Sequence, residues 1–341
     1  MSELVPSRRR TLYQRGPLRR ALLDTSVLTS DVIAATRRRD PSSIVAGARA
    51  GTVRCLIPVH VWEEVPRVLG DRHREGGRFD LGQALALWHS QYLPVLWVVD
   101  AAGLPMTPEA EVLAGRDASD VPMLLLAGVI APVVTIGTDK DLVASGLADA
   151  DYVALRAALG KVGVTEGRMA DLERQAGVLA NVTGRLVKAV VNQATEHLSV
   201  RQTVAAVALA GTVVGALVWQ DRRHPRPRVL VQRQRTLHVV LKHAWKGLEA
   251  LEVKHTQGED RWHQAERGMP GDTLLHRVAR TLVGSPDPMT RTAIVERLGG
   301  HVPGAGHVEQ MAAVRGVLTA HPMFADVSGR GHWQVGRLGG P

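Results

Sequence analysis

The chain has 341 residues, of which 45% are hydrophobic and 4% aromatic, so it can bury a sizeable core built mainly from Ala, Val and Leu. Its formal net charge of +9 favours a polyanionic partner, either nucleic acid or an anionic membrane surface. Cys55 is the single cysteine, which excludes an internal disulfide, a cysteine-based zinc site and an iron–sulfur cluster.

The positive charge is concentrated in the C-terminal third of the chain. From Asp221 to the end, 18 Lys and Arg stand against 11 Asp and Glu, whereas residues 1–220 carry 24 against 22. Residues 1–19 are predicted to form a basic tail, in which three consecutive arginines are not followed by an apolar segment. We therefore expect no secretory signal peptide and a cytoplasmic location.

The first predicted strand is a short apolar run over residues 20–23, which ends in Asp24, Thr25 and Ser26. Such a run between polar residues is typical of a buried strand in an α/β sheet. Ligands of these sheets bind just outside the carboxyl ends of the strands. We therefore expect Asp24 at the mouth of a site.

A second acidic position lies in a predicted helix. Strands are expected at 53–58 and 95–99, and helices at 32–39 (capped by Ser30 or Asp31), 41–50, 59–69, 79–92 and from 107 onward. The helix at 59–69 carries Glu63 and Glu64, and only one of them can face the strand ends. We favour Glu64 from its spacing to the apolar positions, and Glu63 stays open. His60 lies four residues before Glu64, but no second histidine completes a zinc-protease helix.

Two more acidic groups follow. Asp117 is a natural N-cap for a helix over 117–128, and Asp120 follows at the third position, so both residues could simply be capping groups. However, the apolar strand predicted at 133–136 also leads to acidic residues, Asp139 and Asp141. Capping does not explain carboxylates at both places, and we expect these groups to converge.

Carboxylates brought to one point repel each other unless protons or a cation neutralise them. Oxygen ligands without cysteine or histidine suit Mg²⁺ or Mn²⁺. Hard cations held by a few carboxylates are the usual apparatus of phosphodiester hydrolysis. The residues alone therefore predict a metal-dependent nuclease or phosphohydrolase.

The order strand–Asp, helix–Glu, helix–Asp, strand–Asp resembles that of the PIN-domain nucleases. The resemblance covers roughly residues 20 to 150 and is carried by the segments LLDTSVL, DASDVPMLLLA and VVTIGTDKDL. It implies an α/β fold with a PIN-like parallel sheet flanked by helices over residues 20–158, and an endoribonuclease that cleaves an RNA substrate with Mg²⁺ or Mn²⁺.

The resemblance also implies roles for individual residues. The implied catalytic acids are Asp24, Glu64, Asp120 and Asp139. The implied metal ligands are Asp24, Asp120 and Asp139, with Asp117 and Asp141 as accessory groups. Thr25, Ser26 and Thr138 resemble the hydroxyl residues that support the site. A PIN fold kept as a binding or scaffolding module is the alternative.

The middle of the chain, residues 168–220, is predicted to be an amphipathic helix followed by a hydrophobic one. A helix over 152–158 closes the first domain and 160–167 form a linker. The uncharged run 203–219 reaches the lower length limit of a transmembrane helix, and Gly211 and Gly215 would permit close helix packing in a membrane. Membrane association through 203–219 is one interpretation, and a buried helix of a soluble protein or homo-oligomer is the other. Residues 221–270 are expected to form a basic linker, a helix over 229–253 and a polar connection.

The last segment, residues 271–338, is predicted to be a small α+β domain. Helices are expected at 274–282 (capped by Asp272), 291–298 and 308–320, followed by a hairpin of 324–327 and 332–335. This order and the segment HPMFADVSGRGHWQVGR resemble a winged-helix domain. The resemblance implies DNA or protein as a partner and nucleic-acid contacts from Arg315, Arg330 and Arg337.

These expectations combine into one prediction, a metal-dependent PIN-type ribonuclease joined through a hydrophobic helix to a winged helix. Two alternatives stay open. One is a non-catalytic regulator that binds nucleic acid or protein, and the other is a membrane-associated effector. Metal-dependent cleavage separates the ribonuclease from the regulator, and detergent-dependent extraction separates the membrane effector from both.

Overall fold

The computed structural model describes residues 18–38, 42–183 and 230–340. Contacts divide the chain into two compact units. The larger unit combines residues 17–164 with residues 258–341, and the smaller one contains the described parts of 165–257. The segments predicted as the α/β part and as the C-terminal part therefore belong to the same unit.

The larger unit is built on a mostly parallel sheet of five strands in the order β4-β1-β2-β3-β8. Its strands are β1 (Arg19–Leu23), β2 (Val53–Pro58), β3 (Leu96–Val99), β4 (Val134–Ile136) and β8 (Arg337–Leu338). The first four are parallel, and β8 pairs antiparallel with β3. This pairing confirms the prediction of a parallel sheet flanked by helices. The apolar residues of β1 and β2 are buried, as expected for strands inside such a sheet.

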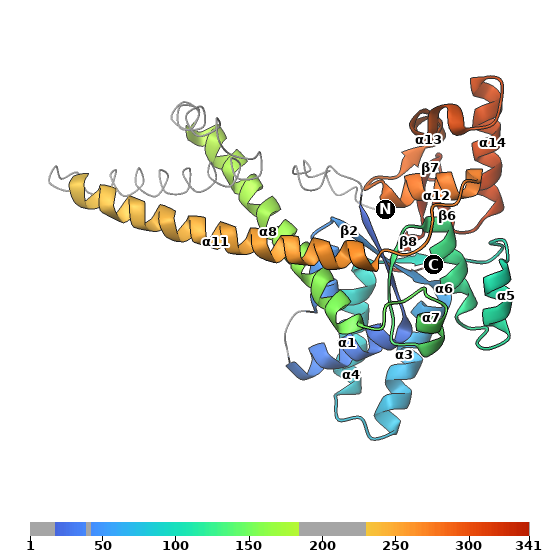
Figure 1. Ribbon diagram of the computed structural model, residues 1–341, viewed down its shortest axis with the longest axis horizontal. Coiled ribbons are helices and arrows are strands. Elements are labelled where there is room, and N and C mark those ends of the chain that lie inside the picture. The colour runs from blue at the N-terminus through green and yellow to red at the C-terminus, as the bar shows by residue number, and fades with distance from the viewer. Residues whose placement is uncertain (1–17, 39–41, 184–229, 341) are drawn as a thin grey trace. The chain divides into compact units, whose positions relative to one another are not determined.

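Seven α-helices belong to the α/β part described between residues 25 and 144. They are α1 (Thr25–Arg38), α2 (Ser43–Arg49), α3 (Val59–Arg74), α4 (Leu81–Leu87), α5 (Pro108–Ala114), α6 (Val121–Ile130) and α7 (Lys140–Ala144). Helices α1, α3 and α4 pack against one another, whereas α6 packs against α5 and against a helix of the C-terminal part (Figure 1). Helix α6 ends before the cis peptide bond of Ala131 and Pro132, where the sequence places a break.

The start of α1 was predicted seven residues too late. The helix begins at Thr25, directly after β1, and the hydroxyl of Thr29 donates to the Thr25 carbonyl inside the helix. Asp31 does not cap a helix because it is buried and accepts hydrogen bonds from Ser42 and Tyr92. Polar residues inside α1 therefore look like capping residues in the sequence, although their side chains bond to groups within the fold.

The predicted linker at 160–167 is wrong, because α8 (Tyr152–Thr183) continues through it. A Cβ atom added at Gly163 would lie 2.2 Å from the Cα of Gly47, and one at Gly160 would lie 2.9 Å from the Cβ of Ser43. These glycines therefore let α8 approach α2 closely and do not interrupt the helix.

The predicted polar connection at 254–270 is also largely helical. Helix α11 (Leu230–Ala265) extends through residue 265, and in the smaller unit His255 contacts Glu166 of α8 at 2.8 Å. Among the described residues, no helix is both long and apolar enough to cross a membrane. The segment 203–219, for which a membrane span was one interpretation, lies outside the described residues.

The C-terminal part contains three α-helices and a three-stranded antiparallel sheet of order β5-β7-β6. Its elements are α12 (Leu274–Gly284), α13 (Arg291–Leu298), α14 (His307–Ala320), β5 (Met289–Thr290), β6 (Phe324–Asp326) and β7 (His332–Val335). The predicted order of helices and hairpin is confirmed. The predicted cap of the first helix is wrong, because Thr273 caps α12 and Asp272 instead accepts from Arg277 at 2.8 Å.

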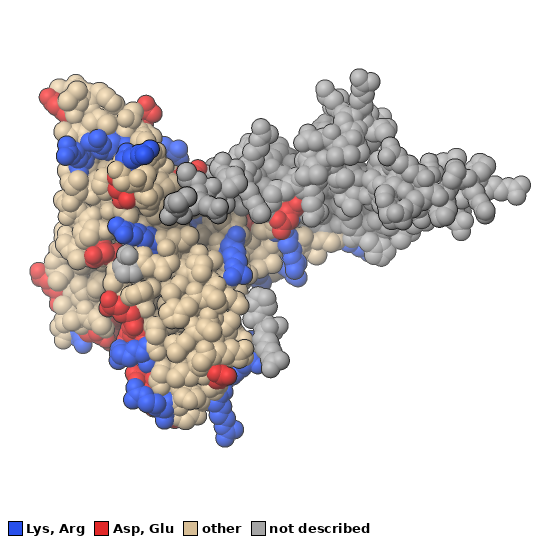
Figure 2. Space-filling model, turned by 180° about the vertical axis from the view of Figure 1, so that it is seen from behind, with Lys and Arg blue, Asp and Glu red and all other residues tan. Residues whose placement is uncertain are grey.

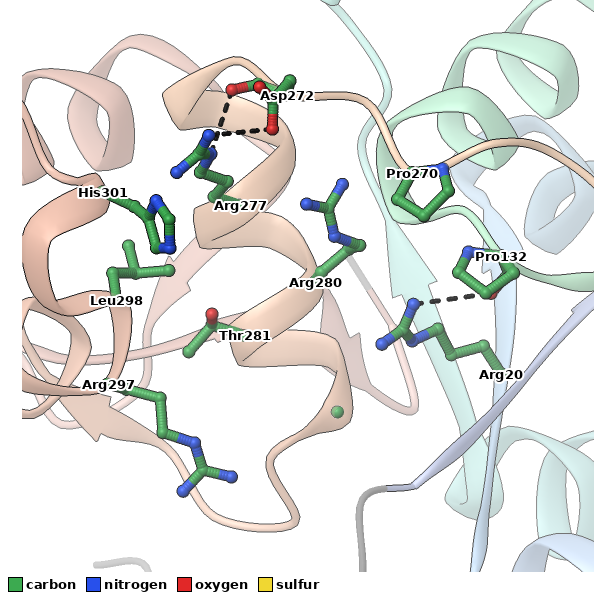
Figure 3. A pocket seen from close by; sticks show the side chains of 11 residues that line it. Arg20, Pro132, Pro270, Asp272, Arg277, Arg280, Thr281, Arg297, Leu298 and His301 are labelled. Atoms are coloured by element: carbon green, nitrogen blue, oxygen red, sulfur yellow. Dashed lines mark hydrogen bonds and ion pairs between the residues drawn. The ribbon is translucent and has the colours of Figure 1, made fainter.

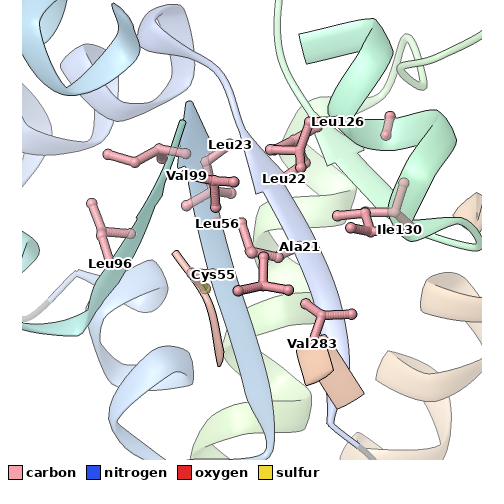
Figure 4. Close-up of a cluster of buried hydrophobic side chains, with 14 of the residues drawn as sticks. Ala21, Leu22, Leu23, Cys55, Leu56, Leu96, Val99, Leu126, Ile130 and Val283 are labelled. Atoms are coloured by element: carbon pink, nitrogen blue, oxygen red, sulfur yellow. The ribbon is translucent and has the colours of Figure 1, made fainter. Parts of the chain in front are cut away.

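The C-terminal part is joined to the α/β sheet by a shared core. Val283 of α12 lies near Ala21 of β1 and Ile130 of α6 in one buried cluster (Figure 4). Arg54 of β2 is buried and donates to the carbonyls of Leu282 at 3.0 Å and Ser285 at 2.7 Å, while its guanidinium stacks 4.2 Å from the Trp97 ring. The arginine thus adds a donor to the Leu282 carbonyl, which also accepts from the Ser285 N–H at 3.2 Å, and bonds to the Ser285 carbonyl beyond the helix end.

Candidate acidic site

The site is assembled where the parallel strands β1 and β4 end. The backbone N–H of Asp24 donates to the Ile136 carbonyl at 3.0 Å, which brings the residue after β1 against the loop after β4. A Cβ atom added at Gly137 would lie 3.1 Å from the Cβ of Asp24. A glycine at this position therefore gives the Asp24 side chain its room beside the loop that carries Asp139.

Asp24 is buried, with 6% of its surface exposed, and it is held by its neighbour Ser26. The Ser26 N–H donates to Asp24 Oδ2 at 3.2 Å, and the Ser26 hydroxyl donates to the same oxygen. Ser26 Oγ in turn accepts from the backbone N–H of Thr138 at 3.0 Å. Burial raises the pKa of Asp24, the Ser26 hydrogen bonds oppose that rise, and the charge of Asp139 adds to it.

Asp120 is the carboxylate with the most strongly perturbed environment. It is 7% exposed and lies immediately before α6, but its side chain makes no capping hydrogen bond, and its Oδ2 is buried without a hydrogen-bond partner. Burial, followed by the charges of Asp139, Asp24, Asp117 and Asp141, raises the pKa of Asp120 to about 7. Four acidic side chains thus act on one buried carboxyl group.

Asp117 does not cap the helix, so the predicted capping arrangement is wrong. Its Oδ1 accepts from the backbone N–H of Ser119 at 2.8 Å within the loop before α6. The Ser119 hydrogen bonds lower the pKa of Asp117, which keeps this carboxylate ionised beside Asp120. Asp120, and not Asp117, occupies the N-cap position, because α6 starts at Val121.

Asp139 and Asp141 lie at the start of α7 and are both half-buried. Asp139 caps the helix, since its Oδ1 accepts from the backbone N–H groups of Asp141 at 2.7 Å and Leu142 at 3.4 Å. The cap fixes the orientation of the Asp139 carboxylate next to Asp24 and Asp120, whose pKa values it raises.

The structure distinguishes the two glutamates of α3. Glu63 is exposed, whereas Glu64 is half-buried and accepts a hydrogen bond from the Thr25 hydroxyl at 2.8 Å. Arg67 donates to the other carboxylate oxygen of Glu64 at 2.7 Å. Glu64 is therefore positioned beside the residue that follows Asp24, as its spacing favoured.

His60 is a member of the site that sequence reasoning did not assign to it. Burial lowers the pKa of His60, while the charges of Glu64, Asp24, Glu63 and Asp117 oppose that change. The lowered pKa favours the neutral imidazole, which can accept a proton. Its spacing of four residues from Glu64 on α3 was the signal in the sequence.

The three candidate nucleic-acid contacts lie on different elements. Arg315 is exposed on α14, Arg330 is exposed in the turn between β6 and β7, and Arg337 is exposed in β8 beside Val98 of the main sheet. On the face seen in Figure 2, basic and acidic side chains are interspersed over the described surface. Contact with nucleic acid therefore stays a prediction for these three exposed residues.

The acidic side chains offer the kind of ligand that a hard divalent cation prefers, but no three of these described residues bring their carboxylate oxygens within 4.8 Å of one another. They supply only oxygen ligands, and the buried Asp120 Oδ2 lacks a partner within the described part of the chain. A cation would both satisfy this atom and offset the repulsion among Asp24, Asp120 and Asp139.

No protein-family model matches the chain, and the searches of curated proteins and solved structures also found no match.

Proposed function

We propose that the protein is a metal-dependent nuclease that hydrolyses phosphodiester bonds, with RNA as its substrate. The observation that carries this proposal is the buried Asp120, whose Oδ2 has no hydrogen-bond partner and whose pKa is raised to about 7 by burial and by four neighbouring carboxylates. A cation stabilises the ionised form of a carboxyl group in such surroundings, whereas without a cation the ionised form destabilises the folded protein.

Asp24, Asp120 and Asp139 are the groups that would hold Mg²⁺ or Mn²⁺, with Asp117 and Asp141 contributing negative charge nearby. The bound cation would supply activation of a water molecule and stabilisation of charge on the phosphate oxygens. The chain itself orients the ligands. Ser26 fixes Asp24, and the backbone of α7 fixes Asp139.

Glu64 and His60 supply proton-accepting groups next to the acidic cluster. Thr25 holds Glu64 at 2.8 Å, and burial lowers the pKa of His60, which favours its neutral form. Either group could accept the proton that a water molecule loses when it attacks phosphorus, since Glu64 is bonded to the residue after Asp24 and His60 is close enough to Asp24 to feel its charge.

The PIN-like and winged-helix assignments are part of this proposal. The strand order β4-β1-β2-β3, with carboxylates after β1 and β4, agrees with a PIN-like arrangement for residues 20–158. The three helices and the β5-β7-β6 sheet agree with a winged-helix segment in 271–338. RNA as the substrate comes from the resemblance alone, so DNA must be tested beside it.

The test is cleavage of mixed single-stranded RNA and DNA pools by the full chain, with Mn²⁺ or Mg²⁺ and with EDTA. Asp24→Asn should lower metal-dependent cleavage of RNA by about 100-fold or more, since it removes a charged ligand while preserving shape. Glu63→Gln is the matched control, because Glu63 is an exposed acid on the same helix as Glu64. Absence of cleavage by a folded, metal-binding wild type would favour the non-catalytic binding module instead.

A further inference from the structure

A second charged site lies at the opposite end of the parallel strands from the acidic site. A pocket of about 510 Å³ opens between α12, α13 and the amino ends of β1 and β4, where Arg20 and Pro132 line it. The other basic groups in its lining are Arg277, Arg280, Arg297 and His301, and the one carboxylate there is Asp272. Figure 3 shows Arg20 of β1 and Arg280 of α12 facing the same space from its two sides.

The single carboxylate does not neutralise the pocket. Asp272 is engaged by Arg277, whose Nη2 donates to its Oδ1 at 2.8 Å and whose Nε donates to its carbonyl at 3.0 Å. Within the part of the chain that the structure describes, no ion pair is found for Arg20, Arg280 or Arg297. Three guanidinium groups therefore retain positive charge around the pocket.

Backbone carbonyls hold two of these arginines in place. Arg20 Nη1 donates to the Ile130 carbonyl at 2.8 Å, and Arg280 Nη1 donates to the Gly271 carbonyl. These bonds fix the side chains without cancelling their charge. Burial and the charge of Arg280 lower the pKa of Arg20, although Glu266 opposes this change. Burial and the charge of Arg277 likewise lower the pKa of Arg280, and the charge of Asp272 opposes this change.

This pocket is separate from the acidic site. Arg20 lies near the start of β1, and Asp24 lies just after its end, so four residues of extended strand place them about 13 Å apart. The carboxylate cluster repels anions in the absence of a cation, whereas the arginine pocket attracts them. The two ends of one strand thus carry opposite charge.

We propose that the arginine pocket binds a ligand that carries two or more adjacent phosphate groups. The guanidinium fork matches the geometry of phosphate oxygens, and several forks around one space can each take a different phosphate. The pocket volume of about 510 Å³ is suited to a nucleotide-sized ligand. The phosphates can belong to a free nucleotide or to a nucleic-acid end, and the proposal does not depend on catalysis at the acidic site.

The test uses the full chain in EDTA, so that any nuclease activity is suppressed, and titrates ATP, inorganic tripolyphosphate and a short single-stranded RNA. Arg280→Gln and Arg297→Gln should each weaken tripolyphosphate binding by about 10-fold. Arg291→Gln is the matched control, because Arg291 lies on α13 with Arg297 but does not line the pocket. Its affinity should stay within about twofold of the wild type.

The outcomes separate the sources of the phosphate. ATP and tripolyphosphate binding that depends on Arg280 and Arg297 would assign the pocket to a free nucleotide. RNA binding that has the same dependence and needs a 5′-triphosphate end would assign it to a nucleic-acid end, and RNA binding without any tripolyphosphate binding would overturn the proposal. No saturable binding of any probe, or equal weakening by Arg291→Gln, would overturn the proposal. If Arg280→Gln unfolds, the exposed Arg297 still provides the test.

Discussion

The raised pKa of Asp120 predicts that the metal-free protein becomes more stable when this residue is replaced by asparagine. The folded-state pKa of about 7 lies above the ordinary value of 3.8, so the folded state holds its proton more tightly than the unfolded chain does. The contribution of this group to stability is therefore present below pH 3.8 and is lost as the pH rises through 7. Asp120→Asn removes the titration and should avoid that loss.

The size of the effect follows from the pKa change. A rise from 3.8 to about 7 corresponds to at most about 4 kcal/mol. The neighbouring carboxylates Asp117 and Asp139 are half-buried, so water screens part of their repulsion and we expect about 2 kcal/mol at pH 8. For a compact unit of this size, that difference raises the unfolding temperature by about 5 °C.

The assay is thermal unfolding in EDTA between pH 5 and pH 8, with Glu63→Gln as a control for the loss of one acidic group. The advantage of Asp120→Asn over the wild type should grow as the pH rises, whereas Glu63→Gln should follow the wild type. An Asp120→Asn variant that is less stable than the wild type at pH 8 in EDTA would refute the reasoning, because the carboxylate would then be stabilised by its surroundings.

Three further predictions follow from the same structure. Mn²⁺ should raise the unfolding temperature of the wild type more at pH 7.5 than at pH 5.5, since the ligands must lose protons to bind it, and equal shifts would contradict this. Arg54→Met should lower the free energy of unfolding by about 3 kcal/mol in urea titrations, because two carbonyls lose a charged donor, and Arg54→Lys should not restore both bonds. Gly163→Ala should lower the free energy of unfolding by about 2 kcal/mol or more in the same titrations, because its Cβ would meet the Gly47 backbone. Gly316→Ala on α14 is the control. Its Cβ would meet nothing within 4 Å, so the free energy of unfolding should stay the same or rise.

Much of the sheet could be predicted from the sequence, because local patterns encode it. The apolar run of β2 has the predicted bounds, and β3 and β4 each begin one residue after their predicted starts. Strand β8 was not predicted, since it has only two residues, both exposed, and its pairing with β3 depends on contacts more than two hundred residues away in the chain. Short strands of this kind carry no periodic signal.

The helix errors have a common physical cause. Gly160 and Gly163 were interpreted as linker residues because glycine disfavours helices, but close packing against α2 requires them there. Ser30 and Asp31 were interpreted as caps, yet they form part of a helix whose polar side chains bond to carbonyls and to Tyr92. In both cases contacts with residues distant in the sequence determine the structure, and local helix propensity does not reveal such contacts.

The two charged sites differ in how far the sequence could reveal them. Asp24 directly follows β1, and Asp139 comes three residues after the end of β4, so parallel topology predicted their proximity. Asp120 was recognised from its place before α6. The arginine pocket combines Arg20 with residues 270–301. Its assembly depends on the docking of α12 against β1 and α6, which the sequence pattern of either segment alone does not specify.

The most direct test of the central claim measures whether Asp24 and Asp139 act as one metal-binding unit in cleavage. The Mn²⁺-dependent cleavage rate of a labelled single-stranded RNA is compared among the wild type, Asp24→Asn, Asp139→Asn and the double variant. We expect each single substitution to lower the rate by about 100-fold or more, and the double variant to be no slower than the slower single one. Wild-type cleavage that is unchanged by EDTA, or losses that multiply in the double variant as for independent groups, would contradict the account.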